Sequence, residues 1–315
     1  MFNTSKAIKV LSDEEELLNG SIIYIAQLVG VNYNKNTGGN YMSITALDFL
    51  SEMQENINKE EISKVELLDF IALQICKECK SYFAFKGGYT LSKMLEEPRM
   101  TQDIDISIQA KEDYEEFKLV LTSIGNNLIE RGLITTYEIK PDITETSSGG
   151  IKCRDESGEI LVGVDIGLHQ LTVGVGRLDF TFDEVNAFVP ERMIADKISA
   201  ILSRKRFRRA KDIYDLYCLT TQYRLNYTLL KELVDMRLEG NEGLWDNIPF
   251  NEIVLVQYEH AYDKLVLKSF FNGEALIKPP FSKVCSLFYK LVEPLKKGEL
   301  RTEWNNTTGV WMGKR

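Results

Sequence analysis

Two aspartates separated by one residue are the first groups in this sequence that could carry out chemistry. They stand in the segment Asp103-Ile104-Asp105-Ile106, where acidic and apolar side chains alternate. Because successive side chains of a strand point to opposite faces, this pattern predicts that Asp103 and Asp105 share one face while the isoleucines face a core. Neighbouring carboxylates repel each other unless a cation lies between them, and Mg²⁺ is usually held by one or two carboxylates together with substrate phosphates. The segment therefore predicts a divalent-metal site.

A pair of glycines precedes these aspartates, directly after the apolar run Tyr82–Phe85. Gly87 and Gly88 are followed by a helix-compatible segment, Tyr89–Glu97, which ends at Pro98. Glycine allows the backbone to approach a ligand, and N–H groups at a helix start attract anions, so this turn predicts a phosphate cradle. Each feature alone is more often a tight turn or a solvated strand edge, but their order along the chain indicates a nucleotide-handling site.

A third aspartate, Asp165, interrupts the alternating apolar segment Ile160–Ile166, which predicts a strand. A carboxylate inside such a strand is costly unless a cation or hydrogen-bond donor pairs with it. Asp165 therefore either belongs to a charged site or lies at a strand end that faces solvent.

The segment that must supply positive charge to such a site is Glu191–Thr220, which is helical by periodicity and unusually basic. As one continuous helix it would place five residues on a single stripe: Lys197, Arg204, Arg208, Lys211 and Asp215. A break around Arg206–Ala210 would instead produce two helices joined by a basic turn. A charge run of this kind is often only a solvated face. Its cations are Arg192, Lys197, Arg204, Lys205, Arg206, Arg208, Arg209 and Lys211.

These motifs resemble those of the AbiEii/AbiGii toxin family. The pattern K-G-G-x-x-L is formed by Lys86–Leu91, R-x-T-x-D-I-D-I by Arg99–Ile106, and K-D-x-Y-D-L by Lys211–Leu216. Members of this family are nucleotidyltransferases of bacterial abortive-infection and toxin–antitoxin systems, related in fold to DNA polymerase β. Relatives commonly carry Thr directly after the glycines, whereas this chain has Tyr89 followed by Thr90.

The resemblance covers about residues 80–220 and implies a role for each matching residue. It implies catalytic roles for Asp103, Asp105, Lys197 and Asp212, with Lys197 on the triphosphate. It implies that a metal is held by Asp103, Asp105 and Asp165. It implies that the nucleotide is bound by Lys86, Gly87, Gly88, Thr90, Arg99, Arg204 and Asp215. It implies that the acceptor is bound by Arg206, Arg208, Arg209 and Lys211.

Composition narrows the classes of protein to which the chain can belong. With 315 residues, 44% hydrophobic and 27% charged, it is typical of a globular protein. Its net charge of −9 does not favour nucleic acid in bulk, so any RNA contact must come from a local basic patch. The sequence has no signal pattern and no apolar run of membrane-spanning length, so we expect a cytoplasmic protein without a membrane partner. Five scattered cysteines and two histidines indicate neither a disulfide framework nor a zinc cluster.

Together these features predict an α+β fold: a polymerase-β-like nucleotidyltransferase mixed sheet flanked by helices, followed by a mainly helical C-terminal domain. We expect three regions. Residues 1–80 form an N-terminal helical region, residues 81–190 form the nucleotidyltransferase core, and residues 191–315 form the C-terminal domain with the basic helix. The last residues, 305–315, are expected to form a frayed or docked tail.

The resemblance further implies a toxin that moves a nucleoside monophosphate from an NTP, either GTP or a pyrimidine NTP, to RNA. A tRNA 3′ end is the expected acceptor, Mg²⁺ or Mn²⁺ the cofactor, and an antitoxin from the same operon the partner, without a stable complex. Two alternatives remain open. A protein- or small-molecule-nucleotidylating enzyme such as an AMP-transferase would use the same carboxylates with another acceptor. A GTP- or NTP-binding regulator would keep the glycines and the basic helix without turnover.

Overall fold

The structure is a computed structural model that describes residues 63–144, 147–180, 182–202, 210–240, 242–247 and 252–313. Most of the predicted N-terminal helical region therefore lies outside the described residues. The arginines of the predicted basic turn also lie outside them: Arg204, Arg206, Arg208 and Arg209.

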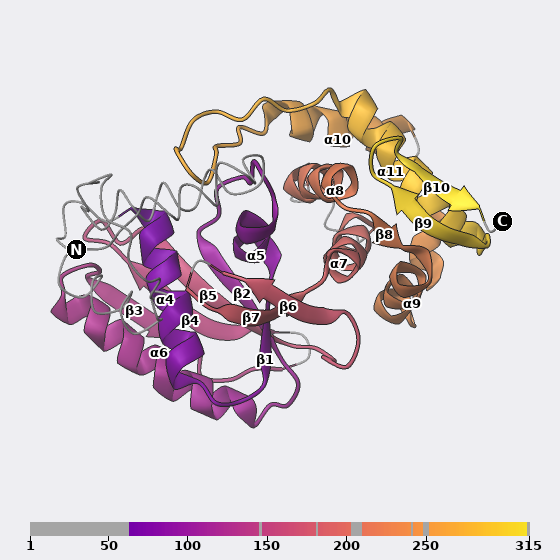
Figure 1. Cartoon of the computed structure of the whole chain (residues 1–315). Coiled ribbons are helices and arrows are strands. Elements are labelled where there is room, and N and C mark those ends of the chain that lie inside the picture. The colour runs from indigo at the N-terminus through magenta and orange to yellow at the C-terminus, as the bar shows by residue number, and fades with distance from the viewer. Residues whose placement is uncertain are drawn as a thin grey trace, which may run out of the picture.

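A seven-stranded mixed sheet forms the centre of the fold, in the order β3-β4-β5-β2-β1-β7-β6 (Figure 1). β2 pairs in parallel with β5 and β1 with β7, whereas the remaining neighbours are antiparallel. This arrangement confirms the predicted mixed sheet. The strands are β1 (Phe83–Lys86), β2 (Asp103–Ile108), β3 (Thr136–Ile139), β4 (Gly149–Arg154), β5 (Ile160–Leu168), β6 (Val175–Asp179) and β7 (Glu184–Phe188).

Two helices cover one face of this sheet (Figure 1): α4 (Lys64–Glu78) and α6 (Asp113–Glu130). Ile104 and Ile106 of β2 are fully buried in the core that these helices close. The predicted core face of β2 is therefore confirmed, and Asp103 and Asp105 project from the opposite face.

On the opposite face, α5 and α7 contact the sheet and α8 packs against α7: α5 (Gly87–Met94), α7 (Pro190–Leu202) and α8 (Ala210–Gln222). In one straight helix Lys197 and Asp212 would be about 22 Å apart along the axis. Instead, Lys197 Nζ lies 2.7 Å from Asp212 Oδ1. The continuous-helix alternative is therefore wrong, and α7 and α8 are two helices that lie side by side.

The C-terminal part is mainly helical, as predicted, but it also contains a small sheet in the order β10-β9-β8. Its helical elements are α9 (Tyr227–Leu238), the 3₁₀ helix η2 (Glu242–Asn247), α10 (Glu252–Lys264) and α11 (Phe281–Lys297). Its strands are β8 (Leu225–Asn226), β9 (Arg301–Asn305) and β10 (Val310–Gly313).

The predicted tail is a docked β-hairpin, in which β9 pairs with β10. Trp304 and Trp311 are buried, and their indole nitrogens donate to the carbonyl oxygens of Thr220 (2.7 Å) and Leu291 (2.9 Å). These bonds attach the hairpin to α8 and α11. In the described part of the chain, no helix has the length and apolar character needed to span a bilayer.

Candidate active site

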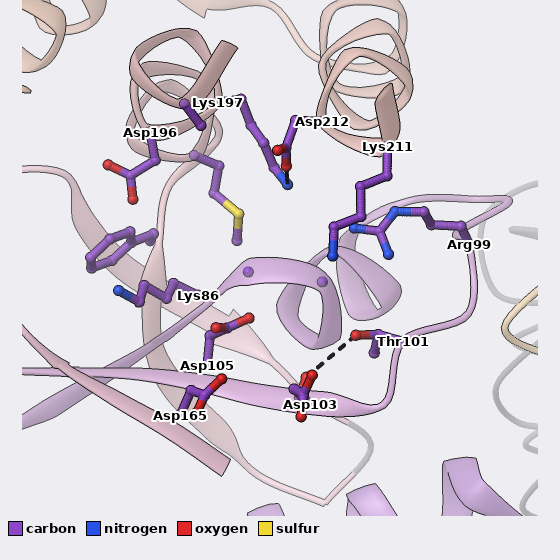
Figure 2. A pocket seen from close by; sticks show the side chains of 15 residues that line it. Lys86, Arg99, Thr101, Asp103, Asp105, Asp165, Asp196, Lys197, Lys211 and Asp212 are labelled. Carbon is purple, nitrogen blue, oxygen red and sulfur yellow. Dashed lines mark hydrogen bonds and ion pairs between the residues drawn. The ribbon is translucent and has the colours of Figure 1, made fainter. Parts of the chain in front are cut away.

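Three predicted metal carboxylates meet on the face of the sheet that α5 and α7 cover (Figure 2). Asp165 is the direct register partner of Asp105 on the parallel strand β5. Lys86, the last residue of β1, is the register partner of Asp105 on the other side. Directly paired residues of neighbouring strands point to the same face, so sheet register brings Asp103, Asp105 and Asp165 together.

The glycine turn lies against this carboxylate face. Gly87 has a φ of +71°, a conformation that L side chains rarely adopt, and a Cβ there would lie 1.9 Å from Asp105 Oδ2. A Cβ at Gly88 would lie 2.8 Å from Thr101 Oγ1. The helix α5 begins at Gly87 and ends at Met94, so the predicted segment Tyr89–Glu97 starts too late and ends too late. Backbone N–H groups at the start of α5 therefore lie beside Asp105, where an anion could bind.

The donor set fits a metal that binds together with substrate phosphates. Among the described residues, no three His, Cys, Asp or Glu side chains are already arranged to hold an ion. Burial raises the pKa of the Asp105 carboxyl; Lys86 opposes this effect and the charge of Asp165 adds to it. The charge of Lys86 thus does not offset the effects of burial and of the neighbouring carboxylate on Asp105. A divalent ion on Asp103 and Asp105, completed by phosphate oxygens, would supply the missing positive charge.

Lys152 of β4 is a cation of this site that sequence reasoning missed. Its Nζ lies 3.0 Å from Asp103 Oδ1 and 3.4 Å from Asp165 Oδ1. Gly163 lies between them, because a Cβ there would be 2.6 Å from Asp103 Oδ1 and 2.9 Å from Lys152 Nζ. Burial alone would lower the pKa of Lys152, but the hydrogen bond to Asp103 and the charges of both carboxylates raise it. No local sequence pattern marks Lys152; only the pairing of β4 with β5 does.

The three carboxylates and the glycine turn line one pocket, which we call the active pocket, with a volume of about 290 Å³. Most of the predicted site residues with described positions line it: Lys86, Gly87, Gly88, Arg99, Asp103, Asp105, Asp165, Lys197, Lys211 and Asp212. It also contains residues that were not predicted: Thr101, Phe188, Met193, Asp196 and Ala200. Thr101 could have been suspected, because it belongs to the R-x-T-x-D pattern.

A buried ion network forms the wall of the active pocket at α7 and α8. Lys197 Nζ lies 2.7 Å from Asp212 Oδ1 and 2.6 Å from Asp215 Oδ2. Arg99 donates two hydrogen bonds of 2.7 Å to Asp215, one from Nε and one from Nη2. Burial alone would raise the pKa of Asp215, but Lys197 and Arg99 outweigh it and lower that pKa to about 2. The network therefore links Arg99, in the segment between α5 and β2, to the helices α7 and α8.

Two predicted nucleotide contacts require correction. Thr90 is fully buried, does not line the active pocket, and its hydroxyl donates to the Lys86 carbonyl oxygen at 2.9 Å. Asp215 is only 1% exposed and its carboxylate is occupied by Arg99 and Lys197. A hydroxyl at the pocket wall comes instead from Thr101. In this structure the side chains of Thr90 and Asp215 are both buried and bonded within the chain.

Several solved structures are similar to this chain. One is a nucleotidyltransferase toxin, MenT4, from Mycobacterium tuberculosis H37Rv, with 14% identity, coverage of 81% of this chain and 99% of that one, and a TM-score of 0.39. Another is JHP933 from Helicobacter pylori, with 14% identity, 75% and 94% coverage, and a TM-score of 0.41. A third is the lincosamide antibiotic adenylyltransferase LnuA, with 15% identity, 51% and 99% coverage, and a TM-score of 0.36.

A search of curated proteins gives no match. A family model does match: its description is "Nucleotidyl transferase AbiEii toxin, Type IV TA system", and it spans residues 72–275, well over half of the chain. The matched region includes the whole seven-stranded sheet and the active pocket. The chain therefore belongs to the AbiEii family of nucleotidyltransferase toxins of type IV toxin–antitoxin systems, and it has the nucleotidyltransferase fold of that family.

Proposed function

We propose that this nucleotidyltransferase moves a nucleoside monophosphate from an NTP to an RNA acceptor, in a reaction that depends on Mg²⁺ or Mn²⁺. One observation carries the proposal: Asp103, Asp105 and Asp165 gather on one sheet face, directly against the Gly87 turn. In this reaction the acceptor hydroxyl oxygen bonds to the α-phosphorus and the bond to the bridging oxygen breaks. Pyrophosphate then leaves with the electron pair and the hydroxyl proton passes to water.

The chain's own residues bind and orient the triphosphate. The N–H groups of Gly87 and Gly88 at the start of α5 hold the β- and γ-phosphates. Lys211 lines the active pocket and is exposed to it, which makes it a triphosphate contact as well as the predicted acceptor contact. Lys197 is already bonded to two carboxylates, so its main role is to position Asp212 at the pocket wall.

Asp103 and Asp105 would hold the divalent ion, with Asp165 as the third carboxylate. When bound, such an ion neutralises the phosphate oxygens and the leaving pyrophosphate. Lys152 Nζ lies close to Asp103 and Asp165, two of the carboxylates that would hold this ion. We therefore infer that Lys152 holds the carboxylates in place before metal and nucleotide arrive.

The acceptor we propose is a small structured RNA, with a tRNA 3′ end as the specific candidate. The net charge of −9 opposes the approach of a polyanion, so RNA binds only where local cations outweigh it. The segment with most of these cations, residues 204–209, lies outside the described residues but leads directly into Lys211 at the pocket. The family implies a cognate antitoxin, and we propose that it acts without a stable complex with this chain. GTP and the pyrimidine NTPs are the candidate donors.

The experiment that tests this function incubates the protein with each α-labelled NTP, total RNA and Mg²⁺. We expect label on a small RNA, and none when the metal is chelated or when Asp103→Asn replaces the wild type. Label on protein bands with all RNA unmodified would identify a protein-nucleotidylating enzyme instead. Binding of an NTP without any transfer would identify a nucleotide-binding regulator.

A further inference from the structure

A second cavity lies next to the active pocket, with a volume of about 410 Å³. The two cavities share Lys86, Asp105 and Asp165. The active pocket extends from these residues toward the start of β2, at Arg99 and Thr101. The second cavity extends toward the end of β5. Its own lining includes Ser147, Ser148, Gly167, His169 and Arg237.

The chemistry of nucleotide transfer determines which cavity receives the acceptor. In an in-line displacement the attacking oxygen and the leaving pyrophosphate lie on opposite sides of the α-phosphorus. The proposed cradle for the β- and γ-phosphates, Gly87–Gly88, lines the active pocket and not the second cavity. With the α-phosphate at Asp105, the attacking hydroxyl arrives from the end of β5, so Lys211, which lines the active pocket, would contact the acceptor only away from its terminal nucleotide.

We propose that the second cavity binds the terminal nucleotide of a single-stranded RNA acceptor, with its 3′ hydroxyl at Asp105 and Asp165 and its phosphate at Arg237. The proposal rests on the proposed function and names the acceptor subsite of that same centre. A volume of about 410 Å³ is at the small end of the range for small-ligand pockets, roughly 300–1,000 Å³. We infer that one nucleotide, rather than a base pair, occupies this space.

Arg237 of α9 lines the second cavity, and its side chain is 32% exposed. Its Nε lies 2.7 Å from Asp196 Oδ1, and Arg192 Nε lies 4.0 Å from the same oxygen. All three atoms are buried and none has a well-aligned hydrogen-bond partner among the described residues. The guanidinium groups of Arg192 and Arg237 share the single carboxylate of Asp196, so these three side chains together carry a net positive charge beside the cavity. A phosphate is the ligand that guanidinium groups of this kind bind best.

His169, Ser147 and Ser148 give the second cavity uncharged polar groups. Burial, followed by the charge of Lys86, lowers the pKa of His169 to about 4, so the imidazole is neutral at pH 7. Ser107 Oγ lies 3.1 Å from His169 Nδ1, which orients the ring. Ser148 accepts a hydrogen bond of 3.1 Å from Lys140 Nζ at the same wall. A neutral flat ring and hydroxyls suit a base and a ribose.

The test measures fluorescence anisotropy of a labelled four-nucleotide oligoribonucleotide with a free 3′ hydroxyl, in the presence of Mg²⁺. Loss of one charge-assisted hydrogen bond in Arg237→Gln should raise the Kd about tenfold or more. Lys231→Gln is the matched control: it removes one positive charge from the same helix, at a residue paired with Asp235 and outside the second cavity. Its Kd should stay within about twofold of the wild type.

Gly167→Ala is a second variant that removes no charge and keeps a strand-compatible backbone. Its Cβ would lie 2.8 Å from His169 Cε1, so the new methyl group crowds the cavity wall. We expect weaker binding of the oligoribonucleotide, while the Kd of a labelled non-hydrolysable NTP analogue stays within about twofold. This result would assign the second cavity to the acceptor even if Arg237→Gln were poorly folded.

The outcomes separate this inference from the proposed function. Oligoribonucleotide binding that Arg237→Gln and Gly167→Ala weaken, in a protein that transfers no nucleotide, would support the cavity and overturn the function. Transfer to RNA with binding unchanged in both variants would overturn the cavity. A wild-type protein that does not bind the oligoribonucleotide, or that binds a blunt duplex equally well, would also overturn it. Transfer to protein that Gly167→Ala blocks would show that a protein side chain occupies the cavity.

Discussion

Replacing Lys197 with methionine should destabilise the protein strongly, because it removes the cation between two buried carboxylates. The side chains of Asp212 and Asp215 are only 5% and 1% exposed, and Lys197 Nζ lies within 2.7 Å of both. Breaking a buried pair by removal of one partner costs about 3–5 kcal/mol. The pKa of about 2 for Asp215, against about 3.9 in an unfolded chain, corresponds to about 2–3 kcal/mol from Lys197 and Arg99 together. Because Asp212 also loses its contact with Lys197, we expect a loss of about 3–5 kcal/mol.

Urea unfolding of the wild type, Lys197→Met, Asp212→Asn and the double variant measures this loss. The double variant should lose clearly less than the sum of the two single variants, because Lys197 and Asp212 are in direct contact and each single substitution already breaks that contact. Lys231→Met is the matched control, since it also replaces a lysine on a helix but breaks a more exposed pair with Asp235. That control should change the free energy of unfolding by less than about 1 kcal/mol. A Lys197→Met variant as stable as this control would refute the account of the network.

The remaining predictions concern pH, the glycine turn and the cations. The folded pKa of Asp215 is about 2, below its unfolded value, so its contribution to stability is present above about pH 4 and is lost as pH falls toward 2. The thermal midpoint should therefore fall across this pH range. A thermal midpoint that does not change with pH would contradict this contribution of Asp215. Gly87→Ala should abolish transfer, since its Cβ would lie 1.9 Å from Asp105 Oδ2 at a φ of +71°; near-normal turnover would exclude the turn from the site. Mn²⁺ should raise the thermal midpoint more in Lys152→Met than in the wild type, because the substitution removes the cation that is paired with Asp103. An equal rise in both proteins would show that Lys152 does not compete with the metal for Asp103.

Local periodicity was sufficient to predict the carboxylate face. A period of two places Asp103 and Asp105 on one side of β2 wherever the strand lies, and the buried Ile104 and Ile106 confirm it. The position of Asp165 beside Asp105 depends on which strands are neighbours and in which register. The sequence alone could therefore identify Asp165 as a candidate. It could not decide whether Asp165 belongs to the charged site or faces solvent at a strand end.

Residues without a local pattern could not be predicted. Lys152, His169 and Arg237 are single residues in unremarkable surroundings, and sheet pairing or helix packing brings them to the carboxylates from distant segments. Periodicity also could not show that α7 and α8 are separate helices, because both keep the same spacing of apolar residues. The long-range ion pair of Lys197 with Asp212 decides that question.

The central claim is that Asp103 and Asp105 support metal-dependent transfer of a nucleotide from an NTP to RNA. The most direct measurement is the amount of α-labelled nucleotide transferred to RNA by the wild type and by Asp105→Asn across a Mg²⁺ titration. The substitution removes a ligand charge but little volume, so we expect the folded variant to transfer no label at any Mg²⁺ concentration, while the wild type transfers label only when Mg²⁺ is present. An Asp105→Asn variant that retains activity within a few-fold of the wild type would contradict the account.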